Sequence, residues 1–182
     1  MGDVLETPRL RLRRLEAGDL EAMLAYRNDP EVARYQTFRA RTRAEIAELI
    51  RAQAALVPGT PGSAFQYAVG LKADDELIGD VYFAVEPDGR QAEIGYTLAA
   101  GAQGHGYATE AVRAVLAFGF ERAGLHRITA GADPRNLPSI RLLERLGFRR
   151  EGYFPESYWD GEMWTDDVRY ALLAREWRAR AR

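Results

Sequence analysis

Apolar and polar residues alternate along several short segments of the chain, which is the pattern of half-buried β-strands. In the segment AFQYAVGL, for example, Phe65, Tyr67 and Val69 alternate with smaller or polar neighbours. The turn Pro87-Asp88-Gly89 separates two such segments, because proline presets φ and glycine accepts a positive φ. The pattern predicts strands over residues 9–15, 64–71, 77–85, 92–98, 126–132 and 167–173.

Other segments carry apolar residues three and four positions apart, the spacing of a helix that buries one face. Thr42 and Glu45 stand three residues apart, as in a capping box, at the start of the clearest of these stripes. Asn136 is a suitable N-cap for a later helix, and Gly147 is suited to its C-terminal end. The spacing predicts helices over residues 18–27, 42–56, 109–124 and 136–148.

The order of these elements is a strand, two helices, three strands, and then alternating helices and strands. Strands joined by short turns pair antiparallel, whereas a strand–helix–strand unit favours parallel pairing. We therefore predict an α/β fold with a mixed, mostly antiparallel central sheet and helices on both faces. With 182 residues, the chain is expected to form a single domain over residues 1–182, since domains typically hold about 100 to 200 residues.

Composition and charge narrow the possible functions. The 25 basic and 27 acidic side chains give a net charge of −2, which offers no general attraction to a polyanion, so nucleic acid is not an expected partner. The chain has no cysteine, which excludes cysteine nucleophiles and zinc sites built on thiolates. It has neither a signal-peptide layout nor an apolar run of about 18 residues, so a cytoplasmic protein without membrane contact is expected.

The segment AQGHGYATEA, residues 102–111, contains two glycines and then turns into a helical pattern. A Walker phosphate loop needs a lysine and a serine or threonine after its glycines, and Tyr107 and Ala108 stand there instead. A dinucleotide fingerprint is also weak, because the segment follows a run of antiparallel strands. A glycine loop at a helix N-terminus still offers free amides to an anion. The alternative interpretation is a tight strand-to-helix turn without a ligand.

Longer motifs surround this loop. Gln103, Gly106 and Ala108 form the spacing Q-x-x-G-x-A, with AEIGYTL before them and NLPSIRLLERLGFRREG after them. In this order the motifs resemble the GCN5-related N-acetyltransferase (GNAT) superfamily. ETPRLRLRRL near the start and DDVRYALLAREW near the end are similar to its RimJ/RimL branch, which acetylates protein N-terminal amines and includes relatives acting on small amines. The resemblance covers roughly residues 6 to 178.

The resemblance implies acetyl-CoA as the co-substrate and no metal. It implies that the glycine loop wraps the pyrophosphate through backbone amides, and that a strand splayed from its neighbour pairs with the pantetheine arm. The N–H of Leu98 would polarise the thioester carbonyl. Asn136 matches an asparagine that bonds the pantetheine arm, although a plain helix N-cap also explains it. For His105 and Arg141, simple exposure to solvent is the alternative. The implied cofactor-binding residues are Leu98, Ala99, Ala100, Gln103, Gly104, His105, Gly106, Tyr107, Ala108, Thr109, Asn136 and Arg141.

Because the chain lacks cysteine and any evident Ser–His triad, we expect the amine to attack the bound thioester directly in a ternary complex. That route needs a base for the ammonium and a proton source for the leaving thiolate. Glu93 stands near the position where family members often place the base; the alternative is a solvated strand glutamate. The tyrosine acid of many members is replaced by Leu143. Ser139 matches a serine of RimL-like relatives that lies near the sulfur, or it satisfies a local backbone amide.

The resemblance to this branch implies an acceptor site between the N-terminal helices and a late hairpin. The aromatic-rich FPESYWDGEMW, residues 154–164, supplies Tyr158, and Tyr35 is a candidate from the N-terminal region. These aromatics either wall a channel for an amine or belong to the core and to a dimer interface. The chain is expected to be a monomer or a homodimer. The expected function is acetyl transfer to a primary amine, with a protein or peptide N-terminus as the acceptor. The alternatives are a small-molecule acetyltransferase, a non-catalytic CoA-binding module and an unrelated nucleotide-binding protein.

Overall fold

The computed structural model describes residues 4–36, 41–160 and 162–180. Within them, eight strands form one sheet in the order β1-β2-β3-β4-β5-β6-β8-β7. All neighbouring strands pair antiparallel except β5 and β6, which are parallel. The predicted mixed, mostly antiparallel sheet is therefore confirmed. The strands are β1 (Leu5–Glu6), β2 (Leu10–Arg14), β3 (Ala64–Leu71), β4 (Leu77–Val85), β5 (Gln91–Leu98), β6 (Arg127–Ala132), β7 (Arg149–Trp159) and β8 (Trp164–Leu173).

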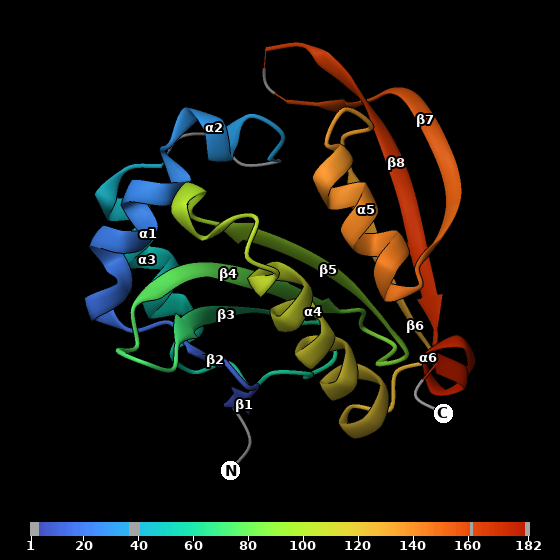
Figure 1. Cartoon of the computed structure of the whole chain (residues 1–182), viewed down its shortest axis with the longest axis horizontal. Coiled ribbons are helices and arrows are strands. Elements are labelled where there is room, and N and C mark those ends of the chain that lie inside the picture. The colour runs from blue at the N-terminus through green and yellow to red at the C-terminus, as the bar shows by residue number, and fades with distance from the viewer. Residues whose placement is uncertain (1–3, 37–40, 161, 181–182) are drawn as a thin grey trace.

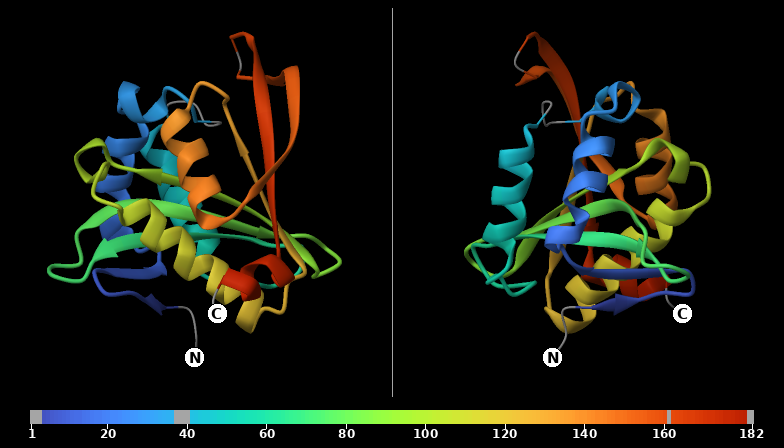
Figure 2. Two further views of the ribbon diagram at one scale, coloured as in Figure 1. Left: turned by 45° about the vertical axis from the view of Figure 1, so that its right-hand side comes forward. Right: turned by 90° about the vertical axis from the view of Figure 1, so that its left-hand side faces the viewer.

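Helices cover both faces of the sheet (Figure 1 and Figure 2). On one face, α1 and α3 pack on a small core that includes Met23, Ile46 and Ala68. On the other face, α4, α5 and α6 pack on the main core, to which Tyr67 and Val69 belong. Tyr67, Ala68 and Val69 are consecutive in β3, and they alternate between the two cores because successive strand side chains point to opposite faces. The helices are α1 (Leu20–Arg27), α2 (Pro30–Ala33), α3 (Arg43–Gln53), α4 (Tyr107–Ala117), α5 (Leu137–Leu146) and α6 (Ala174–Arg180), with 3-10 turns η1 (Ala17–Asp19) and η2 (Ala100–Ala102) and a π-helical turn η3 (Phe118–Arg122).

Local sequence signals set the ends of these helices. The hydroxyl of Thr42 accepts from the amide of Glu45, whose carboxylate accepts from the amide of Thr42, so the predicted capping box is present. Asn136 caps α5, and Gly147 ends it with a left-handed φ of 97°. Pro30 begins the short helix α2, which the apolar spacing does not predict. In the described part of the chain, no helix has the length and apolarity needed to cross a membrane.

The hydrophobic pattern also misses β1, β7 and α6. Strand β7 lies at the edge of the sheet, and its residues are exposed or half-buried. A strand with solvent on both faces needs no apolar alternation, and Pro155 and a register shift between Phe154 and Tyr158 interrupt it further. With β8 it forms the long hairpin that rises beside α5 in Figure 1.

Strands β5 and β6 pair only along their first halves. Their three parallel pairs end at Glu93 and Thr129, although β5 continues to Leu98. Beyond this point the part of the sheet formed by β1 to β5 diverges from β6 to β8 (Figure 1). The predicted splayed strand pair is therefore present. It leaves residues 94–98 without a neighbouring strand on that side, and we call this segment the open edge of β5.

Candidate active site

The open edge of β5 presents backbone polar groups on the side away from β4. The amide of Ala99 donates to the Ile78 carbonyl over 2.9 Å, so Leu98 and Gly79 are a pair that exchanges no backbone hydrogen bonds. The N–H and C=O of Leu98 therefore point away from β4, and those of Tyr96 do the same by the alternation of the strand. A ligand with amide groups can extend the sheet at this edge, as a peptide does when it adds a strand.

The glycine loop follows this edge directly. Gly104 and Gly106 adopt left-handed φ values of 80° and 81°, and Gly106 is the N-cap of α4 without a side-chain capping bond. The amides of Tyr107, Ala108 and Thr109 lie in the first turn of this helix, where no helix carbonyl can accept from them. A Cβ added at Gly104 would meet nothing within 4 Å, so this face of the loop is open. Loop amides and a helix N-terminus together suit an anion.

A residue from the start of the chain holds this loop in place. Arg9 Nε donates to Glu110 over 2.7 Å, and Arg9 Nη1 donates to the His105 carbonyl over 3.0 Å. Its guanidinium also lies 4.5 Å from the centre of the Tyr107 ring. Burial alone would raise the pKa of Glu110, but hydrogen bonds from Thr7 and Arg9 outweigh it and hold this pKa below its ordinary value. The carboxylate therefore stays ionised and keeps Arg9 against the loop.

Residues between β5 and the glycines have supporting positions. Gln103 donates from its side-chain amide to the Leu98 carbonyl over 3.1 Å, which ties the loop to the end of β5. Ala99 uses its amide in the bond to β4, and Ala100 begins the turn η2. The chain therefore turns sharply after Leu98 and returns to it through Gln103.

Two of the predicted cofactor-binding side chains face solvent. His105 stacks on Tyr107 with the ring centres 5.8 Å apart, and both His105 and the α5 residue Arg141 are exposed. The backbone amides are therefore the better-defined anion site in this region.

Asn136 and Ser139 stand at the start of α5, next to the open edge of β5. Asn136 Oδ1 accepts from the Ser139 amide over 3.2 Å, which is the N-cap interaction that its alternative interpretation predicts. The Ser139 hydroxyl lies 2.7 Å from the hydroxyl of Tyr96. Burial raises the pKa of Tyr96 to about 12, against the lowering effect of the bond to Ser139. Ser139 is therefore linked to β5 through Tyr96, a residue that was not among the predicted site residues.

Glu93 lies on the face of β5 opposite to Tyr96, since three positions separate them along the strand. Its carboxylate is 44% exposed and lies 3.0 Å from Arg169 Nη1 on β8. Arg169 also binds Asp167, and both help to line a cavity of about 200 Å³ at the β7–β8 hairpin, together with Tyr158. Glu93 is therefore open to water and close to the predicted acceptor side.

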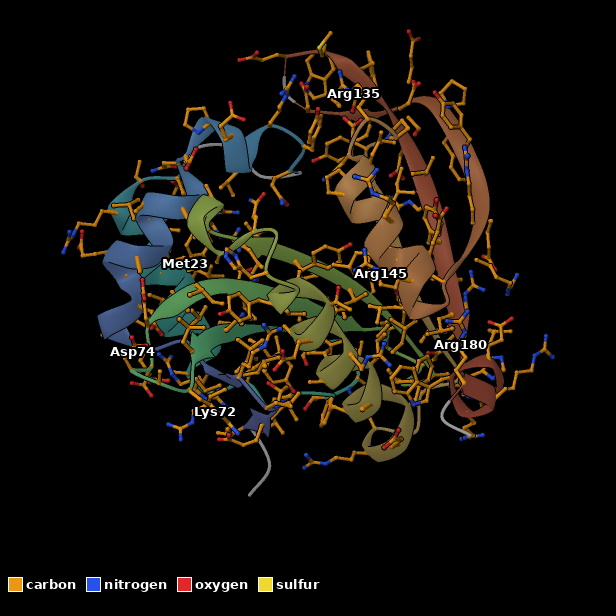
Figure 3. All side chains as sticks on the ribbon, in the orientation of Figure 1. Met23, Lys72, Asp74, Arg135, Arg145 and Arg180 are labelled. Atoms are coloured by element: carbon orange, nitrogen blue, oxygen red, sulfur yellow. The ribbon has the colours of Figure 1, made fainter. Side chains whose placement is uncertain are left out.

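Tyr35 reaches this end of the molecule from the other side. Its ring lies 5.3 Å from the guanidinium of Arg34 and 5.9 Å from that of Arg135. Arg135 in turn binds Asp133 and stands beside the tip of the hairpin in Figure 3. Tyr35 follows α2 by two residues and Tyr158 lies on β7 of the hairpin, and these two segments are at the same end of the molecule (Figure 1).

The rest of the described chain offers a weaker alternative. A cavity of about 470 Å³ lies near the start of β5, where Glu86, Gln91 and Arg127 contribute to its walls, but none of the predicted site residues does. Across residues 4–36, 41–160 and 162–180, no three potential ligand side chains gather as a metal site. We therefore assign the candidate active site to the open edge of β5.

Known proteins share this architecture. The family model for the acetyltransferase (GNAT) domain matches residues 9–149. The chain is 34% identical over 173 residues to the uncharacterized N-acetyltransferase YnaD of Bacillus subtilis (strain 168), covering 95% of this chain and 98% of that protein. It is 33% identical over 118 residues to the ribosomal protein uS5-alanine N-acetyltransferase of Escherichia coli (strain K12), covering 64% of this chain and 61% of that protein.

A solved structure is similar over nearly the whole chain. The crystal structure of the acetyltransferase (GNAT family) from Bacillus anthracis matches with a TM-score of 0.84 and 32% identity, covering 95% of this chain and 99% of that one. The residues that the family model matches, 9–149, include the glycine loop and the open edge of β5.

Proposed function

Because the chain belongs to the GNAT acetyltransferase family and is an acetyl-CoA-dependent N-acetyltransferase, we propose that it acetylates the N-terminal amine of a protein or peptide. The observation that carries the proposal is the open edge of β5, with the glycine loop beyond its end and Glu93 at its start. The amine attacks the acetyl group directly, since the chain has no cysteine to hold an acyl group. Both substrates are bound together in a ternary complex.

The chemistry of the glycine loop and its surroundings fits acetyl-CoA. Gly104 and Gly106 have no Cβ to block a phosphate, and the amides of the first turn of α4 donate to it. Leu98 and Tyr96 offer outward backbone groups to the amides of the pantetheine arm. Asn136 caps α5 through Oδ1, so its NH₂ group can donate to the same arm and both interpretations of this residue hold together.

Three groups act on the reacting atoms. Glu93 takes the proton from the ammonium, directly or through a water. The N–H of Leu98 donates to the thioester carbonyl oxygen as negative charge develops there. Ser139 donates a hydrogen bond to the sulfur of the leaving thiolate. Glu93 and Ser139 lie toward opposite faces of the sheet, so the base for the amine and the donor to the sulfur do not compete for the same space when the amine adds to the carbonyl and the tetrahedral intermediate expels the thiolate.

The acceptor side carries aromatic rings and ion-paired carboxylates. Tyr35 lies beside Arg135. Asp167 pairs with Arg169 on the wall of the cavity that Tyr158 also lines. Trp159 and Trp164 pair at the hairpin with their ring centres 5.5 Å apart. Aromatic faces and carboxylates both favour a cationic amine. The relative from Escherichia coli is named for an alanine of ribosomal protein uS5, which supports a protein acceptor.

Release of free CoA thiol from acetyl-CoA tests this acceptor class. Peptides with a free N-terminal alanine or serine should be turned over, and the same peptides with a blocked N-terminus should not. Spermidine, free amino acids and aminoglycosides provide the small-amine comparison. A higher kcat/KM for one of these amines than for any peptide would replace the protein acceptor by a small molecule. No release with any amine would contradict the proposal altogether.

The Gly79→Ala variant is expected to weaken acetyl-CoA binding by about tenfold, because a shift of β5 misplaces the donors at its open edge. A Cβ at Gly79 would lie 2.2 Å from the Thr97 carbonyl oxygen and 2.9 Å from Leu98 Cα. These are backbone atoms, so the end of β5 must move and the Leu98 amide moves with it. Titration calorimetry with acetyl-CoA measures the effect.

Gly18→Ala is the matched control for this variant. Gly18 lies in the turn η1, outside the open edge of β5, and a Cβ there would meet nothing within 4 Å. Its affinity for acetyl-CoA should stay within about twofold of wild type. Equal affinities for the two variants would mean that the position of the Leu98 amide does not limit binding.

A further inference from the structure

Tyr96 joins two segments that the divergence of β5 and β6 separates. It lies on the open edge of β5, three residues beyond the last pair between these strands. Its hydroxyl lies 2.7 Å from Ser139 Oγ and 3.3 Å from the Ser139 carbonyl oxygen, at the start of α5. The sequence separation of the two residues is 43 positions, so only the fold brings them together.

Both the backbone amide and the side-chain hydroxyl of Ser139 are hydrogen-bonded in this arrangement. Its amide donates to Asn136 Oδ1 over 3.2 Å, which fixes the first turn of α5. Its hydroxyl has one proton to donate and two lone pairs that accept. Either hydroxyl can be the donor in this pair. When the phenol donates to one seryl lone pair, the seryl proton is free to donate to a third atom.

We propose that Tyr96 is a positioning residue that donates its phenol proton in a hydrogen bond to Ser139 Oγ and so directs the Ser139 hydroxyl toward the sulfur of the leaving CoA thiolate. The proposal rests on the proposed function, in which Ser139 contacts that sulfur. Tyr96 itself touches neither the acetyl group nor the amine. Its effect on the reaction passes through Ser139.

Burial gives the phenol the protonation state that this role needs. With a pKa of about 12, Tyr96 stays neutral at physiological pH and remains a hydrogen-bond donor. No proton leaves Tyr96 during the reaction. The thiolate receives a hydrogen bond from Ser139 and takes its final proton from water.

The aromatic ring of Tyr96 has a separate structural role, since it packs against the main core. Tyr96→Phe removes the hydroxyl and retains this packing. We expect kcat to fall about fivefold, the value of one hydrogen bond, with the KM for acetyl-CoA nearly unchanged. Ser139→Ala should lower kcat at least as much, and the double variant should be no slower than Ser139→Ala alone, because both changes remove the same interaction.

Tyr170→Phe provides the control for loss of a buried phenol. Tyr170 is also buried, and its hydroxyl donates to Glu144 on α5 over 3.3 Å, away from the open edge. This variant should keep the kcat of wild type. A wild-type kcat in Tyr96→Phe, or losses that multiply in the double variant, would overturn the role of Tyr96.

A binding measurement separates this inference from the proposed function. We expect CoA to bind more tightly than desulfo-CoA at alkaline pH, and the ratio of the two dissociation constants to shrink in Tyr96→Phe. This readout needs no acceptor amine, so it decides the role of Tyr96 even if no amine is acetylated. A ratio of one in the wild-type protein, or an unchanged ratio in Tyr96→Phe, would contradict the inference.

Discussion

The Glu93→Gln variant is expected to lower kcat/KM for the acceptor amine by about 100-fold near neutral pH, the effect typical of losing a general base. Most of an α-amino group is protonated there, because its pKa is about 8. The variant depends on the small fraction of amine that is already neutral. The loss should therefore be largest at low pH and should shrink as the pH rises above the pKa of the amine.

The ion pair between Glu93 and Arg169 does not prevent this role. The two side chains are 44% and 48% exposed, and exposed ion pairs typically contribute only about 0 to 1 kcal/mol. Such a weak pair orients the carboxylate and is easily broken when the carboxylate accepts a proton. Arg169 also binds Asp167, so the guanidinium stays at the acceptor side when Glu93 changes its state.

Glu86→Gln is the matched control for Glu93→Gln. After burial, the charges of Glu93 and Glu86 both raise the pKa of Tyr82, so both carboxylates lie near that side chain. Glu86 is exposed beyond the end of β4 and should tolerate the change without loss of rate. Initial rates between about pH 6 and about pH 9 bracket the pKa of the amine. A pH–rate profile for Glu93→Gln that runs parallel to that of wild type would remove Glu93 from the mechanism.

The parts of the structure that the sequence predicts are those set by near neighbours in the chain. The capping box of Thr42 and Glu45 and the cap of Asn136 each act over three residues. The strand and helix patterns predict the sheet and its two helical layers for the same reason. The splayed strand pair and the role of the glycine loop were predicted from the resemblance to a family. Local patterns alone left the loop open to interpretation as a plain turn.

The supporting contacts of the site lie beyond such patterns. Arg9 and Glu110 are 101 positions apart, and Glu93 and Arg169 are 76 positions apart. No local periodicity links such residues, because the fold alone makes them neighbours. The sequence held one signal for the role of Tyr96, because a tyrosine on the core-facing side of a strand needs a hydrogen-bond partner for its hydroxyl. The sequence does not say that this partner is Ser139.

A second set of long-range contacts leads to a prediction about stability. Asp80→Asn is expected to lower the free energy of unfolding by about 3 to 5 kcal/mol, as for other broken buried ion pairs. Asp80 is 1% exposed and accepts from Arg27 Nη2 over 2.9 Å, from the Tyr26 hydroxyl over 2.5 Å and from the side chain of Gln66. An asparagine at this position removes the negative charge that Asp80 places beside the buried guanidinium and turns an NH₂ group toward these donors.

The same change at an ion pair with an exposed carboxylate calibrates this expectation in urea denaturation experiments. Asp75 is 45% exposed and pairs with Arg13 over 3.1 Å, and Arg13 keeps its pair with Asp19, so Asp75→Asn should cost less than about 1 kcal/mol. Adding Arg27→Met to Asp80→Asn should restore part of the loss, because the buried positive charge that Asp80 balances is then absent. A loss for Asp80→Asn as small as that for Asp75→Asn would contradict the ion pair as the cause.

The Asp80 contacts hold α1 against β4, and Asp80 lies opposite Thr97 on β5, the neighbouring strand whose open edge receives acetyl-CoA in the proposed function. Acetyl-CoA affinity should therefore fall together with stability in Asp80→Asn and recover with it in the double variant.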